Sequence, residues 1–505
     1  MKMLRYIVAL TATVALVACD LNEHPDYFTN RAEMFRSEGQ CRAAVNSCYL
    51  NIDPIYSSRM FQITEGCVDT GLTWATTLDP VLDISPAYPR HGSTIWEQCY
   101  KGVMRCNYAV EGLESSTIDN KELLGELIAE AKIMRALYYY VLTCSFGDVP
   151  YYTVDVSSKK ILLEVQRLPR TSAIEIRSQI IADLEDDVVL LEQVKGSDVE
   201  EYRAGAALGW MLIAKMAMWN ASKDEMNAQM WWNKGVEALV ALQNIYGALS
   251  AYTLEDSFQW HRKNTPESIF EIQHTYVAGG VNYTSSIAPA AHPSHTTGTM
   301  VYDGIEIEWL GDNGVNYSQV RPTAYFFKEL QPRGGVDKRT TYNLAWEWQG
   351  QQFDGTATRP WVGIKLWCPD MYHGYDHNNY KIFRYADALL MLAECYAEID
   401  KPTLAVQCLN EVKERAGIDT YIYSSLEELQ EEIRAERARE LFGECHRKFD
   451  LVRWGVWYER TLEFHQNSTL LKNIKPCHEY YPIPDVQVSY SGGALTNDEY
   501  KKYGL

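Results

Sequence analysis

The chain has 505 residues, of which 46% are hydrophobic and 23% charged, so its composition excludes disorder throughout. With 47 Lys and Arg against 67 Asp and Glu, the formal net charge is −20, which argues against a nucleic-acid-binding protein because such proteins need a cationic surface. Past the N-terminus no apolar run reaches ~18 residues, which excludes a polytopic membrane protein. At about 100–200 residues per domain, the length allows two to four domains or one large body built from repeats.

The first residues have the form of a secretory signal. Lys2 and Arg5 precede an uncharged apolar stretch over 7–17, and Leu-Val-Ala at 16–18 leads to Cys19. This ending resembles a bacterial lipobox, in which the cysteine is acylated and becomes the new N-terminus. We therefore predict a signal peptide at 1–18, lipidation of Cys19 and a lipid-anchored tether over 19–32. An ordinary signal peptide with a chance cysteine is the alternative.

Apolar residues at helical spacing predict a mainly α-helical body over 33–505. The predicted helices span 37–51, 94–114, 121–146, 173–192, 203–220, 230–246, 383–399, 402–416, 425–445 and about 450–458. They come in twos joined by short turns, and stacked helix pairs bury faces that one pair cannot. We predict a tetratricopeptide-like scaffold at about 33–250 and 381–460.

Local signals mark several helix ends. Gly147 and Pro150 follow the helix predicted over 121–146 and predict its stop. Ser172 with Glu175, and Ser425 with Glu428, have the spacing of capping boxes at helix starts. The charged run from Glu431 to Glu440 is predicted to be a solvated or ion-paired surface.

Two regions lack helical periodicity. Residues of about 250–380 are rich in Gly, Ser, Thr, Pro and Asn, with tryptophans among them, and we predict a loop-rich ligand-binding face there. The C-terminal 461–505 is also predicted to be a loop region.

No metal or disulfide site is predicted. Besides Cys19 there are eleven cysteines, an odd number, and none has zinc-finger spacing. His292 and His295 lie in a proline-broken loop, where ligation from one helix face is not available. We predict no metal site and no cofactor, and leave a structural calcium ion open.

Several segments, in order along the chain, are very similar to the SusD/RagB family of outer-membrane lipoproteins. The most specific are AKIMRALYYYVLTCSFGDVPYY at 131–152, RYADALLMLAE at 384–394, EIRAERARELFGECHRKFDLVRWG at 432–455 and YPIP at 481–484. Lys413, where the family often has Arg, and Gly443 to His446 depart from its pattern at scaffold positions. The resemblance implies a SusD-like helical fold with a loop-rich ligand face. It also implies a non-catalytic cell-surface lipoprotein that passes oligosaccharide to a SusC-like TonB-dependent transporter in the outer membrane.

A sugar binder needs exposed rings among polar loop residues, because a ring stacks on the C–H face of a sugar and polar groups bind its hydroxyls. By this criterion Trp96, Trp210, Trp219, Trp231 and Trp232 are predicted to be core residues. The predicted carbohydrate contacts are Trp74, Tyr88, Tyr283, Trp309 and Trp346.

Three other functions remain open. The same architecture could carry a peptide or another nutrient, and helix pairs could serve only as a protein-binding scaffold. A secreted all-helical hydrolase or lyase is the third, although the chain has no Gly-x-Ser-x-Gly, His-Glu-x-x-His or P-loop motif. We therefore predict no catalytic residues.

Overall fold

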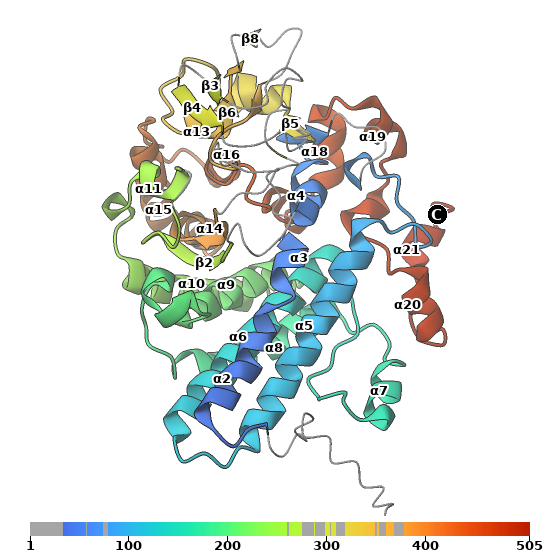
Figure 1. Cartoon of the computed structure of the whole chain (residues 1–505). Coiled ribbons are helices and arrows are strands. Elements are labelled where there is room, and N and C mark those ends of the chain that lie inside the picture. The colour runs from blue at the N-terminus through green and yellow to red at the C-terminus, as the bar shows by residue number, and fades with distance from the viewer. Residues whose placement is uncertain are drawn as a thin grey trace, which may run out of the picture.

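The computed structural model describes residues 34–505 except 57, 74–78, 260–261, 275–286, 288–297, 303–304, 310–318, 349–350, 353–359 and 368–377. Helices form most of the described body, and several of the short strands lie at one end of it (Figure 1). The predicted signal peptide, Cys19 and the tether lie outside the described residues.

The N-terminal half is a stack of helices in chain order. It contains α2 (Glu38–Asn46), η2 (Ser47–Tyr49), α3 (Ile52–Tyr56), α4 (Ser58–Glu65), α5 (His91–Glu114), α6 (Lys121–Phe146), α7 (Lys159–Val165), α8 (Ala173–Val188), α9 (Ala206–Lys223) and α10 (Ala228–Tyr246). From α5 onward each long helix packs on the next: α5 on α6, α6 on α8, α8 on α9 and α9 on α10. This is the predicted arrangement of successive helix pairs.

The stack continues across the segment that separates its two halves in sequence. Helix α10 packs directly on α14 (Tyr385–Glu398), which in turn contacts both α15 (Pro402–Ala416) and α16 (Leu426–Glu440). The chain therefore leaves the helical layer after α10 and returns to it at α14. The predicted mainly α, tetratricopeptide-like scaffold is confirmed.

Between the two halves the structure differs from the sequence prediction. The stretch at 250–380, expected to be irregular, contains short antiparallel strands and short helices such as α11 (Leu254–Phe258) and α13 (Thr340–Asn343) among its described residues. β1 (Gly71–Thr73) pairs with β5 (Val320–Pro322), β2 (Ser268–Ile272) with β10 (Tyr380–Arg384), and β6 (Leu344–Ala345) with β9 (Trp361–Val362). A four-stranded sheet has the order β4 (Ile305–Trp309), β3 (Gly298–Tyr302), β7 (Glu347–Trp348) and β8 (Gln351–Gln352). These strands are two to five residues long, too short for an alternating pattern to stand out.

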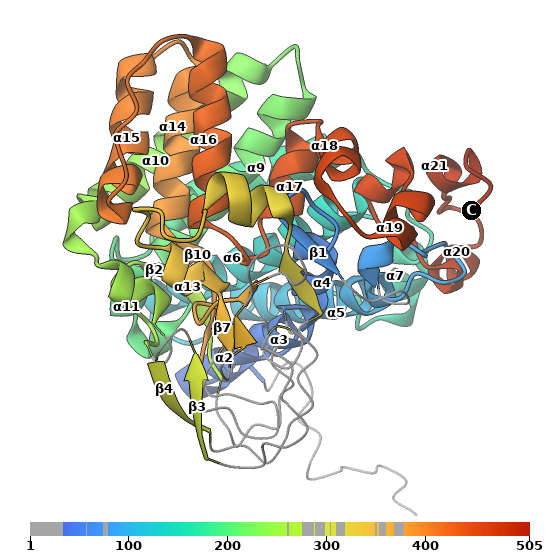
Figure 2. The same cartoon turned by 90° about the horizontal axis from the view of Figure 1, so that it is seen from above.

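Seen from above, β3, β4 and β7 project from the side of the molecule opposite α14, α15 and α16 (Figure 2). The predicted C-terminal loop region also needs correction, because it contains short helices. They are α18 (Trp457–Phe464), α19 (Ser468–Asn473), η9 (Pro476–Glu479), α20 (Asp485–Tyr490) and α21 (Asp498–Lys501). All have eight residues or fewer, which gives little room for a helical period.

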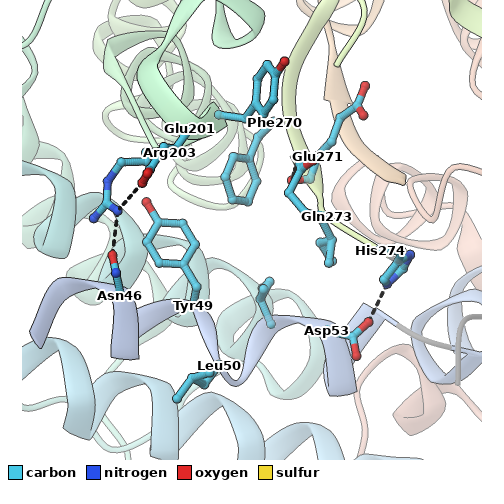
Figure 3. Close-up of a pocket in the computed structure, with 13 residues that line it drawn as sticks. Asn46, Tyr49, Leu50, Asp53, Glu201, Arg203, Phe270, Glu271, Gln273 and His274 are labelled. Carbon is cyan, nitrogen blue, oxygen red and sulfur yellow. Dashed lines mark hydrogen bonds and ion pairs between the residues drawn. The ribbon is translucent and has the colours of Figure 1, made fainter. Parts of the chain in front are cut away.

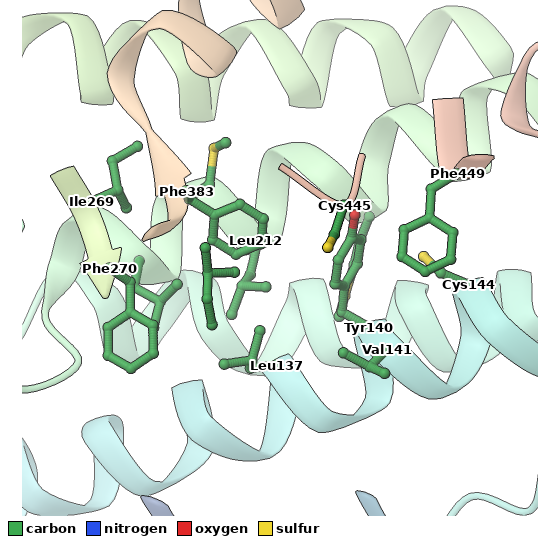
Figure 4. Packing of buried hydrophobic residues seen from close by; sticks show 14 of the residues in the cluster. Leu137, Tyr140, Val141, Cys144, Leu212, Ile269, Phe270, Phe383, Cys445 and Phe449 are labelled. Atoms are coloured by element: carbon green, nitrogen blue, oxygen red, sulfur yellow. The ribbon is translucent and has the colours of Figure 1, made fainter. Parts of the chain in front are cut away.

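The central core joins the helices to the β2–β10 pair. Side chains of α6, such as Leu137 and Tyr140, meet Leu212 of α9 beneath Phe270 and Phe383 of the two strands (Figure 4). Three of the five tryptophans predicted to be core, Trp96, Trp219 and Trp232, are buried. Trp210 and Trp231 are half-buried, and their indole N–H groups donate to Gln193 and Asp224.

The charged run of α16 corrects another prediction. Glu436, Arg437 and Glu440 are almost fully buried, although Glu431 stays exposed. Arg384 contacts Glu267, Glu440 and Glu444 at 2.6–3.1 Å, and Arg339 contacts Asp337, Glu436 and Glu440 at 2.6–2.9 Å. Burial alone would raise the pKa of Glu440, but the nearby guanidinium groups of Arg415, Arg384 and Arg339 hold that pKa well below its ordinary value. The run is ion-paired inside the protein because its partners come from other elements.

Candidate functional site: a cavity between the helical layer and strand β2

A cavity of about 470 Å³ lies between the η2–α3 segment and β2, a volume within the usual range for ligand sites (Figure 3). Its lining residues are Asn46, Tyr49, Leu50, Ile52, Asp53, Glu201, Tyr202, Arg203, Phe270, Glu271, Ile272, Gln273 and His274. His274 directly precedes the segment from 275 onward that the sequence predicts to be part of the ligand-binding face. The cavity therefore borders that face.

One end of the cavity is built around Tyr49. Its ring lies 6.4 Å from that of Phe270, and its hydroxyl donates to Glu130 and accepts from the backbone N–H of Ala204 at 2.8 Å. The guanidinium of Arg203 contacts the same Glu130 carboxylate at 2.9 and 3.1 Å. Burial, together with the Glu130 carboxylate, raises the pKa of Tyr49 well above its ordinary value. Tyr49 is thus a neutral, fixed ring in the cavity wall.

The other end is closed by an ion pair. His274 Nε2 lies 2.6 Å from Asp53 Oδ1 of α3, and His274 Nδ1 lies 3.0 Å from the carbonyl oxygen of Asn378. Both ring nitrogens of His274 therefore face a hydrogen-bond acceptor. The pair joins α3 to the end of β2 across the cavity.

The structure places the predicted carbohydrate contacts in different surroundings. Trp74 and Tyr283 lie outside the described residues, and Trp309 ends β4 with its side chain outside the described part. Tyr88 is 55% exposed, with the Arg90 guanidinium 4.4 Å above its ring, in a loop that accepts a hydrogen bond from Asp485. Tyr88 does not line the cavity.

Trp346 is only 7% exposed. It packs edge-on against Phe327, and Arg333 lies over its ring at 5.5 Å. In this position its ring presents little surface to a sugar. A tryptophan in a glycine- and glutamine-rich segment was expected to be exposed, but the β6–β9 pair beside it places it in the core.

Sequence reasoning missed the cavity. The criterion of a ring within a polar loop excluded Tyr49 and Phe270, which lie on a helical turn and a strand. Residues 46–53 and 270–274 are also more than 200 positions apart, and no sequence period connects them. None of the four family-like segments named from the sequence includes these lining residues.

The described residues contain no metal-ligand cluster, no disulfide and no helix suited to cross a membrane. They contain no group of three or more His, Cys, Asp or Glu side chains placed to hold a metal ion; His292 and His295 lie outside them. Their ten cysteines are free thiols, all but Cys477 buried. None of their helices is both long and apolar enough to cross a membrane.

Comparison with known proteins identifies the family. A model described as SusD family matches residues 338–500, and one described as starch-binding associating with outer membrane matches 33–211; together they span more than half of the chain. The chain belongs to the SusD/RagB family.

Individual relatives agree with this assignment over nearly the whole chain. SusD-like protein P25 of Formosa agariphila is 25% identical over 564 aligned positions, covering 99% of each chain. A SusD superfamily protein of Bacteroides vulgatus has a TM-score of 0.73 at 21% identity, covering 92% of this chain and 100% of its own. Surface glycan-binding protein A of Bacteroides uniformis has a TM-score of 0.71 at 21% identity, with the same coverages. At these identities the structural likeness establishes the fold.

Proposed function

We propose that this protein is a non-catalytic, surface-tethered glycan-binding lipoprotein that captures an oligosaccharide and passes it to a partner TonB-dependent transporter of the outer membrane. Membership of the SusD/RagB family supports the proposal, and one structural relative carries the name of a surface glycan-binding protein. Acylation of Cys19 would supply the anchor, since two or three acyl chains hold a protein firmly on a membrane.

The observation that carries the proposal is the cavity beside the loop-rich segment. Tyr49 and the 44% exposed Tyr202 offer ring surface for the C–H face of a sugar, and Phe270, which is 5% exposed, packs against the Tyr49 ring. Asp53 lies at the cavity wall, and its Oδ2 has no hydrogen-bond partner among the described residues, so it can accept from a hydroxyl. Trp74, Tyr283 and Trp309 remain the sugar contacts that the sequence predicts.

The absence of catalysis is part of the proposal. Two of the three carboxylates of the cavity wall are held by protein groups, Asp53 by His274 and Glu271 by Ser268, Asn264 and Asn379. The third, Glu201, is largely exposed, 3.7 Å from Arg203. A glycosidase needs one carboxyl group that delivers a proton and a second that attacks or activates water. The donors that surround these two groups favour a structural role for both.

A glycan and peptide array probed with the mature protein tests the proposal. We expect binding to glycans, no new reducing ends in the bound material, and loss of binding in Trp74→Ala, Trp309→Ala or Tyr202→Ala. Binding to peptides alone would reassign the cargo. Product that disappears when one carboxylate is replaced would overturn the non-catalytic assignment, and normal binding in all three variants would remove the site.

A further inference from the structure

The polar groups around the cavity are largely occupied by one another. The amide nitrogen of Gln273 donates to Asn264 Oδ1 and to the carbonyl of Glu271, at 2.8 and 3.2 Å. Its amide oxygen accepts from the side-chain nitrogens of Asn264 and Asn379, at 3.0 and 2.9 Å. Two donors and two acceptor positions are all that a glutamine amide has, so Gln273 is saturated.

Three charged groups of the wall are engaged in the same way. Arg203 is held by Glu130 and by Asn46 Oδ1 at 2.6 Å. Glu271 is 4% exposed and accepts from Ser268, from the backbone of Asn264 at 2.7 Å and from Asn379 at 2.9 Å. His274 uses both ring nitrogens. A ligand would have to break these contacts to bind the same atoms.

Between these groups the wall of the cavity is apolar. Tyr49 and Leu50 come from the helical side, Phe270 and Ile272 from β2, and Ile52 from the first turn of α3 (Figure 3). Leu50, at the edge of the cavity, is 61% exposed. Away from Asp53, most hydroxyl groups of an unsubstituted sugar placed against this wall would lose water without gaining partners, which is unfavourable.

We infer that the cavity binds a sugar unit that carries an apolar substituent, such as an acyl or aryl group, and that this substituent lies against Leu50, Ile52 and Ile272. The inference rests on the proposed function and narrows its ligand class. The free oxygen of Asp53 takes a sugar hydroxyl at the edge, and the apolar wall takes the substituent. Burial of one aromatic ring in such a wall strengthens binding by about tenfold or more.

Matched glycosides test this inference. Methyl and p-nitrophenyl glycosides of glucose, xylose, mannose and galactose, together with free p-nitrophenol, are titrated into the mature protein by calorimetry. We expect at least one p-nitrophenyl glycoside to bind about tenfold or more tightly than its methyl counterpart, and more tightly than p-nitrophenol.

Two exposed leucines provide a variant and its control. Leu50→Asn should reduce the aryl preference about threefold or more, whereas Leu404→Asn, on the surface of α15, should leave it unchanged. Equal affinity for methyl and aryl glycosides, or an unchanged preference in Leu50→Asn, would overturn the inference and leave the proposed function intact. If free p-nitrophenol binds as tightly as its glycosides, or if no glycoside binds, both the inference and the proposed function are overturned for this cavity.

Discussion

At the residue scale, the family-like segments act through buried charge. Arg384, Asp387 and Glu394 belong to the segment at 384–394, and each is buried with oppositely charged partners from other elements. Asp387, for example, contacts Lys215 of α9 at 2.6 Å and Arg437 of α16 at 2.9 Å. A neutral residue at one of these positions would remove opposite charge from its buried partners, because these partners come from other elements and are compensated in part by this side chain.

Replacing Arg384 tests this role. Arg384→Met removes the guanidinium that contacts Glu267, Glu440 and Glu444 in a dry environment and leaves only Arg415, Arg339 and Lys365 beside them. We therefore expect a loss of about 3–5 kcal/mol in the free energy of unfolding, measured by urea denaturation. Lys101→Met, which breaks an exposed pair with Glu97, should cost less than about 1 kcal/mol. Similar losses in the two variants would show that the buried network does not stabilise the fold.

Glu65, at the end of α4, gives a pH-dependent prediction. Burial raises its pKa from 4.5 to about 8, although nearby backbone amides of Arg447, Cys445 and Gly443 lower it in part. Between these two values the folded chain keeps a proton that the unfolded chain releases, so this group makes stability fall as the pH rises from about 4.5 to about 8.

Glu65→Gln removes that proton equilibrium. The melting temperature of the variant, scanned from pH 5 to pH 8, should fall less with rising pH than that of the wild type. The difference can reach about 1.4 kcal/mol per pH unit. Glu225→Gln, at an exposed position between α9 and α10, is the control and should follow the wild type. Parallel curves for Glu65→Gln and the wild type would contradict the assignment of Glu65.

At the element scale, two similar sequence signals have different outcomes. Ser425 caps α16 as predicted, accepting from the backbone N–H of Glu428 at 3.2 Å. Ser172 precedes α8 with the same spacing to an acidic residue but makes no cap hydrogen bond. The N–H of Ala173 donates instead to Asp148 Oδ1 at 2.8 Å, from the turn that ends α6. Asp148 thus supplies a hydrogen-bond acceptor at the start of α8, where the capping-box motif predicts one from Ser172.

The two serines are therefore a matched pair. Ser425→Ala should lower the free energy of unfolding by about 1 kcal/mol, because one amide at the start of α16 loses its acceptor. Ser172→Ala should change it by less than about 0.5 kcal/mol. Chemical denaturation of both variants measures the difference in the free energy of unfolding. Equal effects of the two substitutions would show that the hydrogen bond from Glu428 N–H to Ser425 does not stabilise the start of α16.

The sequence predicted the long helices well because a period of 3.6 residues is repeated several times in each. The stop of α6 at Gly147 is confirmed by its φ of +71°, which glycine adopts without strain. Short strands such as β6 and β9 have no repeated period, and their pairing depends on residues far away in sequence. The cavity was missed for the same reason, since Tyr49 and Phe270 meet only through the fold.

At the scale of the whole molecule, the helical stack is a frame and the small sheets and loops lie at its edge. Helices α5, α6, α8, α9 and α10 form one continuous layer with α14, α15 and α16, although about 140 residues separate α10 from α14. A frame of this kind allows the inserted segment to vary in sequence while α10 and α14 stay packed together. The cavity lies at the junction, with one wall from each part.

The anchor is also a property of the whole molecule. We expect the mature protein to begin at Cys19 and to carry acyl chains, visible as added mass on an N-terminal peptide. Cys19→Ala should release the protein from the membrane fraction, because the body has no cationic surplus to hold it there. An unmodified N-terminus in a protein that still sediments with membranes would contradict the predicted lipidation.

The most direct test of the central claim, that an inert helical frame presents a sugar-binding cavity beside its loops, is a structure of the mature protein bound to an oligosaccharide selected on the array. We expect an intact oligosaccharide with one sugar unit in the cavity, against Tyr49 and Phe270 and within hydrogen-bond reach of Asp53. An oligosaccharide bound elsewhere while the cavity holds only solvent, or a cleaved ligand, would contradict it.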